Sequence, residues 1–432
     1  MKLTFILAFI FVQFIYFAQP AKILIIDGFL HKGNGETIDH ALVGIKNGII
    51  TEIGNSLVTR FNKADWDTII SVEGKHIYPG FIATNSTLGL TEIDAVRATR
   101  DFNETGEFNP HVRSQIAFNP ESKVASTVLT NGVLFCQSTP RGGIISGSSA
   151  IMTLNGWNWE DATILADDGI HVNWPSSLQG GGWWAEPAPK KTNENYQIQK
   201  NEIDVFFELA QAYFEGHNKD KEMKFDQRLE AMIGCFKGSK RVYFHADEMQ
   251  QILDIISFSS KFKLKFPVIV GGYDAHLLGK RLKDSNIPIL IRRIHSLPEN
   301  EDDPIDQSFK LPYLLKKEGV LFGIQNAGDM EAMNARNLPF QAGTATAYGI
   351  SEEEAIQSIS LDVCKIIGID KKYGSIEIGK SATLFVSEGN ALEMKTNNVS
   401  LILVNGEFAP TTNFQSDLFQ KYSKKLGAKK QN

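Results

Sequence analysis

The stretch Arg241-Val242-Tyr243-Phe244-His245 is almost continuously apolar and ends in a histidine. Runs of this kind suit strands that are buried on both faces of a parallel sheet. Similar runs occupy 132–136, 268–270, 287–291 and 320–324, and helical periodicity separates them in 202–214, 247–258 and 276–282. The alternation predicts an α/β fold, most economically a (β/α)8 TIM-like barrel. An open doubly wound sheet is the alternative, although no glycine-rich nucleotide-binding element follows an early strand.

Both ends of the sequence carry strand patterns with hairpin turns. Asn47-Gly48 separates 41–46 from 49–53, and Asn405-Gly406 follows the strand-like 399–404. Asn-Gly is the dipeptide that a type I′ turn favours. We expect the two ends to form one composite β-sandwich. The predicted domains are this sandwich from 22–78 and 373–409, the barrel from 79–372, and a C-terminal helical tail over 410–432.

Residues 1–21 have the pattern of a secretory signal peptide. Lys2 precedes an apolar run from Leu3 to Phe17, and the small residues Ala18 and Ala21 follow. The run is shorter than the roughly twenty apolar residues that span a membrane. The sequence therefore predicts export to the periplasm or the medium, and no membrane span.

Charge and cysteine content exclude two other classes of protein. The 432 residues include 44 Lys and Arg against 50 Asp and Glu, a net charge of −6, and no long basic stripe outside the last few residues. Nucleic acid is therefore not an expected partner. Cys136, Cys235 and Cys364 are odd in number and widely spaced in apolar company, which indicates buried thiols and no disulfide framework.

Three segments carry a family resemblance. Ile77-Tyr78-Pro79-Gly80-Phe81-Ile82 places Pro-Gly before an apolar strand, Glu353-Glu354-Ala355 leads to Ile366-Ile367-Gly368, and 374–384 has the sequence GSIEIGKSATL. Together they resemble the amidohydrolase superfamily, specifically its exported members related to imidazolonepropionase. Residues 85–90, 92–93, 95–101 and 157–161 further resemble a subgroup without the H-x-H metal motif. The resemblance implies an amidohydrolase barrel and hydrolysis of non-peptide C–N bonds in amides or cyclic amides.

The chemistry of that family is hydrolysis by a metal-activated water. The resemblance implies an H-x-H pair after the first barrel strand, a His after the fifth, a His after the sixth and an Asp after the eighth. Only His245 stands in its expected place, at the end of the fifth strand. The other positions hold Asn85, Thr87, Gly272 and either Gln325 or Asn326, with His276 and Asp329 lying several residues too late.

One ligand cannot hold a catalytic zinc ion, which needs three. We therefore expect a degenerate metal site and impaired or altered catalysis, with no resident cofactor. A divalent metal such as zinc would bind only if carboxylates such as Glu92, Asp101 or Asp329 rebuilt the site beside His245. The alternative is a non-catalytic ligand-binding protein or partner subunit on the same fold, with His245 bonded to a neighbouring side chain. Expected partners are a small molecule in the barrel mouth, a second copy, or a related amidohydrolase.

One further segment is rich in glycine and serine. Ser146-Gly147-Ser148-Ser149 follows Arg141-Gly142-Gly143. We expect a plain loop at the barrel edge here, and the alternative is an anion site lined by backbone amides.

Overall fold

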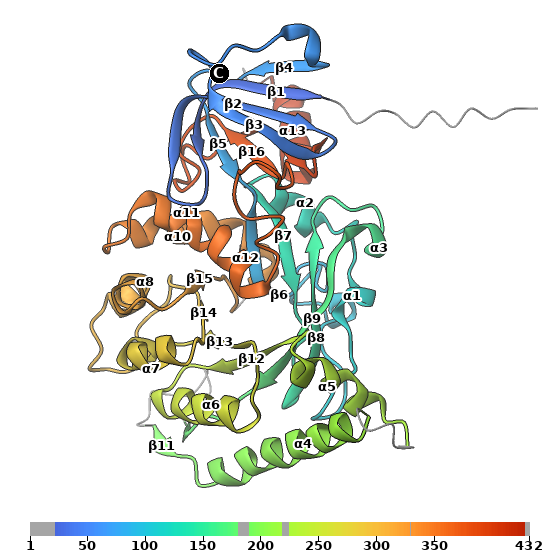
Figure 1. Ribbon diagram of the computed structural model, residues 1–432, viewed down its shortest axis with the longest axis vertical. Coiled ribbons are helices and arrows are strands. Elements are labelled where there is room, and N and C mark those ends of the chain that lie inside the picture. The colour runs from blue at the N-terminus through green and yellow to red at the C-terminus, as the bar shows by residue number, and fades with distance from the viewer. Residues whose placement is uncertain (1–21, 180–189, 218–223, 329, 428–432) are drawn as a thin grey trace, which may run out of the picture.

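The computed structural model describes residues 22–179, 190–217, 224–328 and 330–427. The predicted signal peptide and Asp329 lie outside these residues. Two large sheets organise the described chain, one at the end of the molecule that holds both termini of the described part and one in its middle (Figure 1). A two-stranded ribbon, β10 (Leu178–Gln179) with β11 (Lys191–Thr192), completes the strands.

The terminal sheet combines strands from both ends of the chain. Its members are β1 (Ile23–His31), β2 (Thr37–Lys46), β3 (Ile49–Asn55), β4 (Thr68–Ser71), β5 (His76–Pro79), β16 (Leu384–Ser387), β17 (Val399–Val404) and β18 (Glu407–Phe408). The two ends meet where β5 pairs antiparallel with β16. Asn47 and Gly48 have φ values of 56° and 73°, and Asn405 and Gly406 values of 51° and 83°, so both predicted Asn-Gly turns form.

The described strands from both chain ends all belong to one hydrogen-bonded sheet, so the two ends combine as expected, while the β-sandwich itself stays a prediction. One face of that sheet carries an apolar cluster built from β1, β2, β5, β16 and β17. On the other face Leu24 and Leu42 pack with Trp66, which follows the short 3-10 turn Lys63–Asp65. Both faces of the sheet thus carry buried apolar side chains.

The central sheet carries the predicted barrel strands. In chain order they are β6 (Phe81–Ser86), β7 (Val133–Ser138), β8 (Ile145–Thr153), β9 (Thr163–Asn173), β12 (Arg241–Ala246), β13 (Pro267–Gly271), β14 (Ile289–Ile291) and β15 (Phe322–Ile324). Each pairs with the next in the chain, and the described strands curl as a TIM-like barrel does. The predicted α/β class and barrel-like architecture are therefore found.

The barrel departs from eight parallel strands at one place. β8 runs antiparallel to both β7 and β9, whereas the other neighbouring pairs are parallel. A parallel neighbour needs a crossover of a dozen or more residues, and only residues 139–144 connect β7 to β8. The segment Ser146–Ser149, expected as a loop, lies within β8 and is buried.

The helices of the described residues mostly follow the strands of the central sheet and cover its outer face. They are α1 (Ser114–Ala117), α2 (Lys123–Leu129), α3 (Trp159–Ala162), α4 (Tyr196–His217), α5 (Gln227–Lys237), α6 (Met249–Lys261), α7 (Gly279–Asp284), α8 (Gln307–Glu318), α9 (Glu331–Asn334), α10 (Leu338–Thr346), α11 (Glu352–Ser358), α12 (Leu361–Ile367) and α13 (Phe414–Leu426). The stretch predicted as one helix over 276–282 divides into a 3-10 turn (Ala275–Leu278) and α7.

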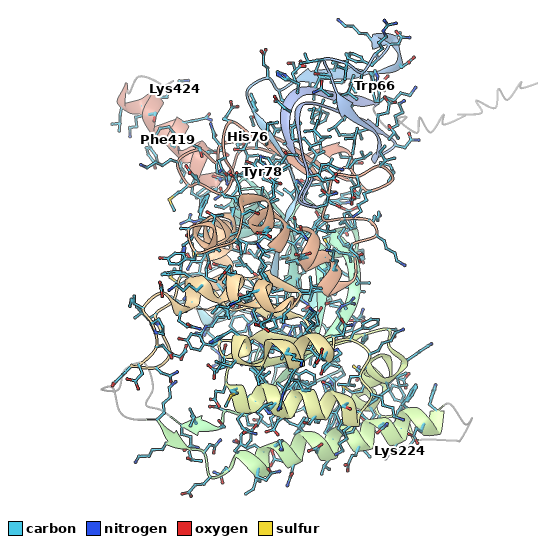
Figure 2. The ribbon with its side chains drawn as sticks, turned by 60° about the vertical axis from the view of Figure 1, so that its left-hand side comes forward. Trp66, His76, Tyr78, Lys224, Phe419 and Lys424 are labelled. Atoms are coloured by element: carbon cyan, nitrogen blue, oxygen red, sulfur yellow. The ribbon has the colours of Figure 1, made fainter. Side chains whose placement is uncertain are left out.

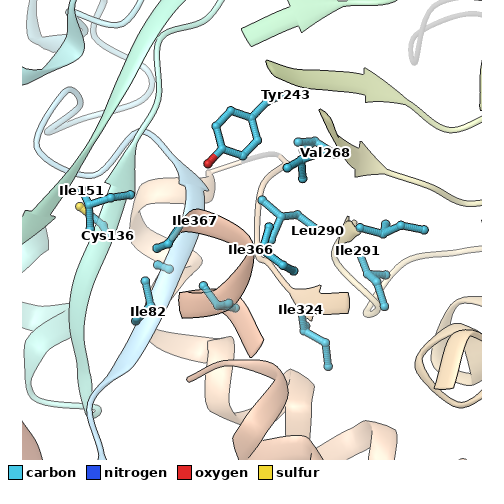
Figure 3. Close-up of a cluster of buried hydrophobic side chains, with 14 of the residues drawn as sticks. Ile82, Cys136, Ile151, Tyr243, Val268, Leu290, Ile291, Ile324, Ile366 and Ile367 are labelled. Atoms are coloured by element: carbon cyan, nitrogen blue, oxygen red, sulfur yellow. The ribbon is translucent and has the colours of Figure 1, made fainter. Parts of the chain in front are cut away.

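The core lies inside the curled sheet. Strand side chains such as Ile82, Ile151, Val268 and Leu290 converge there, and Ile366 and Ile367 of α12 lie among them (Figure 3). Arg241, the first residue of β12, donates a hydrogen bond to the carbonyl oxygen of Ile366, so α12 lies at the strand ends opposite the carboxyl ends. All three cysteines are buried and free, as predicted.

Aromatic side chains pack where the two sheets meet, because the ring of Phe385 in β16 lies edge-on to that of Phe81 in β6 at 5.0 Å between centroids. The ring of Tyr78, in β5, stacks on His31 at 4.3 Å and on Phe385 at 5.3 Å between centroids. Figure 2 shows Tyr78 and His76 where the terminal sheet meets the barrel. The same view shows α13 on the outside of the molecule, with Phe419 and Lys424 on it. No helix in the described ranges is long and apolar enough to cross a membrane.

Candidate functional site

A pocket of about 960 Å³ opens at the carboxyl ends of the central strands. Asn85 of β6, His245 of β12, Gly271 of β13 and Gln325 after β15 all line it. Barrel enzymes place their active sites at this end because the loops that follow the strands converge there. The pocket is therefore the candidate functional site.

Only some of the residues at the expected metal positions converge in this pocket. Asn85, His245 and Gln325 line it, whereas Thr87, Gly272 and Asn326 are not among its lining residues. Thr87 is 2% exposed, and the side chain of Asn326 accepts a hydrogen bond from Gln341. His276 lies outside the pocket lining too, with its imidazole against the Tyr273 carbonyl and Gln307.

A second histidine lies beside His245. His171, on the neighbouring strand β9, has its Nδ1 atom 2.9 Å from Nε2 of His245. Its Nε2 atom lies 2.8 Å from Oγ of Ser149 on β8. Burial and the positive charge of Arg141 lower the pKa of the His245 imidazole to about 3. Burial also lowers the pKa of His171 far below its usual value, so both rings are neutral at pH 7.

A buried carboxylate completes this network. Ser149 Oγ donates to one oxygen of Asp168 at 2.5 Å, and Tyr243 and Gln137 donate to the other at 2.6 and 2.9 Å. Burial raises the pKa of Asp168, while these three donors act against the rise. While Asp168 is ionised, the Ser149 proton points to it, so His171 donates through Nε2 and accepts from His245 through Nδ1. We call Asp168, Ser149, His171 and His245 the buried network.

A fixed cation lies on the other side of the pocket. Arg141, in the β7–β8 connection, donates to Oδ1 of Asn85 at 2.9 Å and to the Asn85 carbonyl at 2.7 Å. Its Nη2 atom also donates to both carboxylate oxygens of Glu331, at 2.9 and 3.1 Å. Asn85 has the left-handed φ of 49°, which asparagine tolerates better than most residues. We call Asn85, Arg141 and Glu331 the arginine cluster.

Other charged side chains line the pocket rim. Arg292 pairs with Glu299 at 2.5 Å and lies 3.7 Å from Asp247. Burial raises the pKa of Asp247, and the positive charge of Arg292 opposes that rise. The rim therefore presents charges of both signs to a ligand.

The amidohydrolase family model matches residues 217–412. Similar solved structures extend over nearly the whole chain. An amidohydrolase from Thermotoga maritima is 22% identical with a TM-score of 0.75, covering 90% of this chain and 100% of its own. Ochratoxinase from A. niger is 13% identical with a TM-score of 0.54, covering 90% and 95%, and molinate hydrolase is 14% identical with a TM-score of 0.52, covering 91% and 96%. At these identities the likeness shows the amidohydrolase fold alone. No curated protein sequence matches the chain.

The side chains at the mouth of this amidohydrolase fold do not fit a catalytic zinc ion. His245 uses its Nε2 atom on His171, and the oxygens of Asn85 accept from Arg141, whose positive charge opposes a second cation. Among the residues that the structure describes, no three His, Cys, Asp or Glu side chains are placed to hold a metal. The structure also does not bring Glu92 or Asp101 to the pocket lining, and Glu92 instead accepts from Asn119.

Sequence reasoning located His245 and Asn85 and missed their partners. His171 and Asp168 lie three residues apart in Asp168-Gly169-Ile170-His171-Val172. Polar residues inside an otherwise apolar, buried strand were the available signal, although this spacing places their side chains on opposite faces of a regular strand. Arg141 and Glu331 carried no comparable signal, because they are 190 residues apart and lie in connections whose paths only the fold decides.

Proposed function

We propose that this protein is an exported amidohydrolase-fold protein whose metal-dependent hydrolysis of non-peptide C–N bonds is lost or strongly impaired, and whose pocket binds a small polar ligand. The relation to imidazolonepropionase-like exported proteins and the signal peptide over residues 1–21 belong to this proposal. A homo-oligomer or a pairing with a related amidohydrolase is compatible with it.

The hydrogen bond between His171 and His245 carries the proposal. A histidine ligates a metal through a nitrogen lone pair. In the tautomer assigned above, Nε2 of His245 donates its proton to His171, so this nitrogen cannot ligate a metal and only Nδ1 keeps a lone pair. Opposite it, Arg141 already supplies a positive charge to the Asn85 oxygens, which stand where the first ligand of the H-x-H pair is expected.

A metal and activity measurement tests the proposal. We expect elemental analysis of the purified protein to find clearly less than one zinc or manganese ion per chain, and amide and cyclic-amide substrates to remain unhydrolysed. His245→Ala and the control His276→Ala should leave both results unchanged. Stoichiometric metal that is lost together with hydrolysis in His245→Ala, and retained in His276→Ala, would overturn the proposal in favour of a working hydrolase.

A further inference from the structure

The pocket contains a guanidinium–carboxylate contact whose anion comes from the chain itself. Both oxygens of Glu331 accept from the single Nη2 atom of Arg141, and the Gly328 amide donates to one of them at 3.2 Å. The strongest arginine–carboxylate pairs use two parallel N–H bonds from two nitrogens. The Arg141–Glu331 contact lacks that geometry, which makes it weaker than the best contact the guanidinium could form.

Arg141 is held in place without Glu331. Its Nη1 atom donates to Oδ1 of Asn85 and its Nη2 atom donates to the Asn85 carbonyl, and Asn85 is only 4% exposed. The Asn85 amide in turn donates to Gln137 at 3.0 Å. If the Glu331 side chain turned away, the guanidinium would therefore keep its position and orientation toward the pocket.

The surroundings of Arg141 hold charges of both signs, and the second guanidinium nearby favours an anion at this point. A Cβ atom built on Gly328 would lie 3.1 Å from Nη2 of Arg293, so a second guanidinium lies close to the segment that carries Glu331. On the other side, the negative charge of Glu331, together with burial, raises the pKa of Asp94. An anion supplied by a ligand would keep the attraction to Arg141.

We infer that Arg141 and Asn85 form a subsite for the carboxylate of a small-molecule ligand, and that Glu331 occupies this subsite until the ligand displaces it. The inference rests on the proposed function in one respect, namely that the pocket binds a small polar ligand. Glu331 acts as an internal competitor, and it lowers the apparent affinity by the fraction of molecules in which it occupies the subsite.

Titration calorimetry with benzoate and benzamide on the full chain tests this inference. The two probes have nearly the same shape and differ in charge. We expect Glu331→Gln to bind benzoate about tenfold more tightly than the wild type does, because the competing charge is gone, and to bind benzamide no better than the wild type does. The matched control is Asp167→Asn, which removes the carboxylate of another arginine pair, Arg113–Asp167 at 2.8 Å, outside the pocket lining. It should leave benzoate binding unchanged.

Arg141→Lys provides a second test, because lysine keeps the positive charge but lacks the guanidinium that Asn85 positions. In a double variant with Glu331→Gln, the Arg141→Lys substitution should abolish the gain in benzoate affinity that Glu331→Gln alone produces. If that double variant does not fold, the comparison of benzoate with benzamide on Glu331→Gln alone decides. Equal binding of the two probes, or no benzoate binding by Glu331→Gln, would overturn the inference. Stoichiometric bound metal would overturn the proposed function instead, so the two failures are distinguishable.

Discussion

The two polar clusters of the pocket differ in how completely they are enclosed. In the buried network Asp168 is 2% exposed and His171 is fully buried, and each oxygen of Asp168 has a donor. In the arginine cluster the side chains of Arg141 and Glu331 are 23% and 13% exposed, and one nitrogen serves both carboxylate oxygens. An enclosed and fully bonded network fixes the fold around it, whereas a cluster open to solvent can exchange one partner for another. The predictions below test this division.

The largest effect is expected from Asp168→Ala. The substitution leaves the hydroxyls of Ser149 and Tyr243 and the amide of Gln137 without their shared acceptor in a buried site. Leaving buried donors unpaired costs about 1 to 3 kcal/mol each, and breaking a buried charged network about 3 to 5 kcal/mol in total. We expect the free energy of unfolding to fall by about 3 to 5 kcal/mol, measured by urea denaturation.

Two asparagine variants provide the contrast. In Asp168→Asn the side-chain carbonyl can still accept from Tyr243 and Gln137, and the new NH2 group can donate to Ser149, whose proton then turns to His171. This variant should lose much less stability than Asp168→Ala. Asp167→Asn, beside it in the sequence, removes only the exposed pair with Arg113 and should cost less than about 1 kcal/mol. If Asp167→Asn lowered the free energy of unfolding as much as Asp168→Ala does, the expected difference between enclosed and solvent-exposed sites would be wrong.

A pH series should separate the contribution of His245. Its pKa is about 3 in the folded protein, and an exposed histidine in the unfolded chain titrates near 6.5. As the pH falls from 6.5 toward 3, the unfolded chain takes up a proton at this residue that the folded chain refuses, so the folded state loses stability. The loss can reach about 1.4 kcal/mol per pH unit.

The measurement is urea unfolding of the wild type and His245→Gln at several pH values from 8 to 4. The stability difference between the two proteins should be constant above pH 7 and should shrink below pH 6.5, because only the wild type carries this titrating group. Burial is the largest cause of the lowered pKa of His171 and remains in His245→Gln, so that shift keeps its sign in both proteins. Parallel curves over the whole range would show that His245 is solvated like a surface histidine.

Part of the fold could be predicted from local patterns. The apolar runs that became β7, β12, β13, β14 and β15 were recognisable because both faces of each strand are buried. The Asn-Gly turns were recognisable because few residues other than glycine and asparagine adopt φ > 0. The antiparallel strand β8 was not recognisable, because Ser146-Gly147-Ser148-Ser149 has the composition of a loop. Its serines are buried in a strand because Asp168, His171 and the Pro110 carbonyl bond to them.

The candidate site likewise has residues that could be predicted from the sequence and residues that could not. His245 and Asn85 were predictable because each follows a recognisable strand, and strand ends meet at one edge of a barrel. Their partners depend on tertiary contacts across 74 and 56 residues, between His171 and His245 and between Arg141 and Asn85. Burial also changes the chemistry of a residue type, since His245 is neutral here for a reason that its local sequence does not contain. These contacts and the neutral state of His245 therefore follow from the tertiary structure and could not be predicted from the sequence.

The smallest effect on stability is expected from Glu331→Gln, and it tests the open side of the comparison. The glutamine keeps the size and can still accept a hydrogen bond from Arg141, while the loss of charge relieves the repulsion that raises the pKa of Asp94. Partly exposed ion pairs contribute about 0 to 1 kcal/mol. We therefore expect the free energy of unfolding to change by less than about 1 kcal/mol in urea denaturation, several times less than for Asp168→Ala. A loss comparable to that of Asp168→Ala would mean that Glu331 is as firmly built into the fold as the buried network, and that no ligand could displace it at small cost.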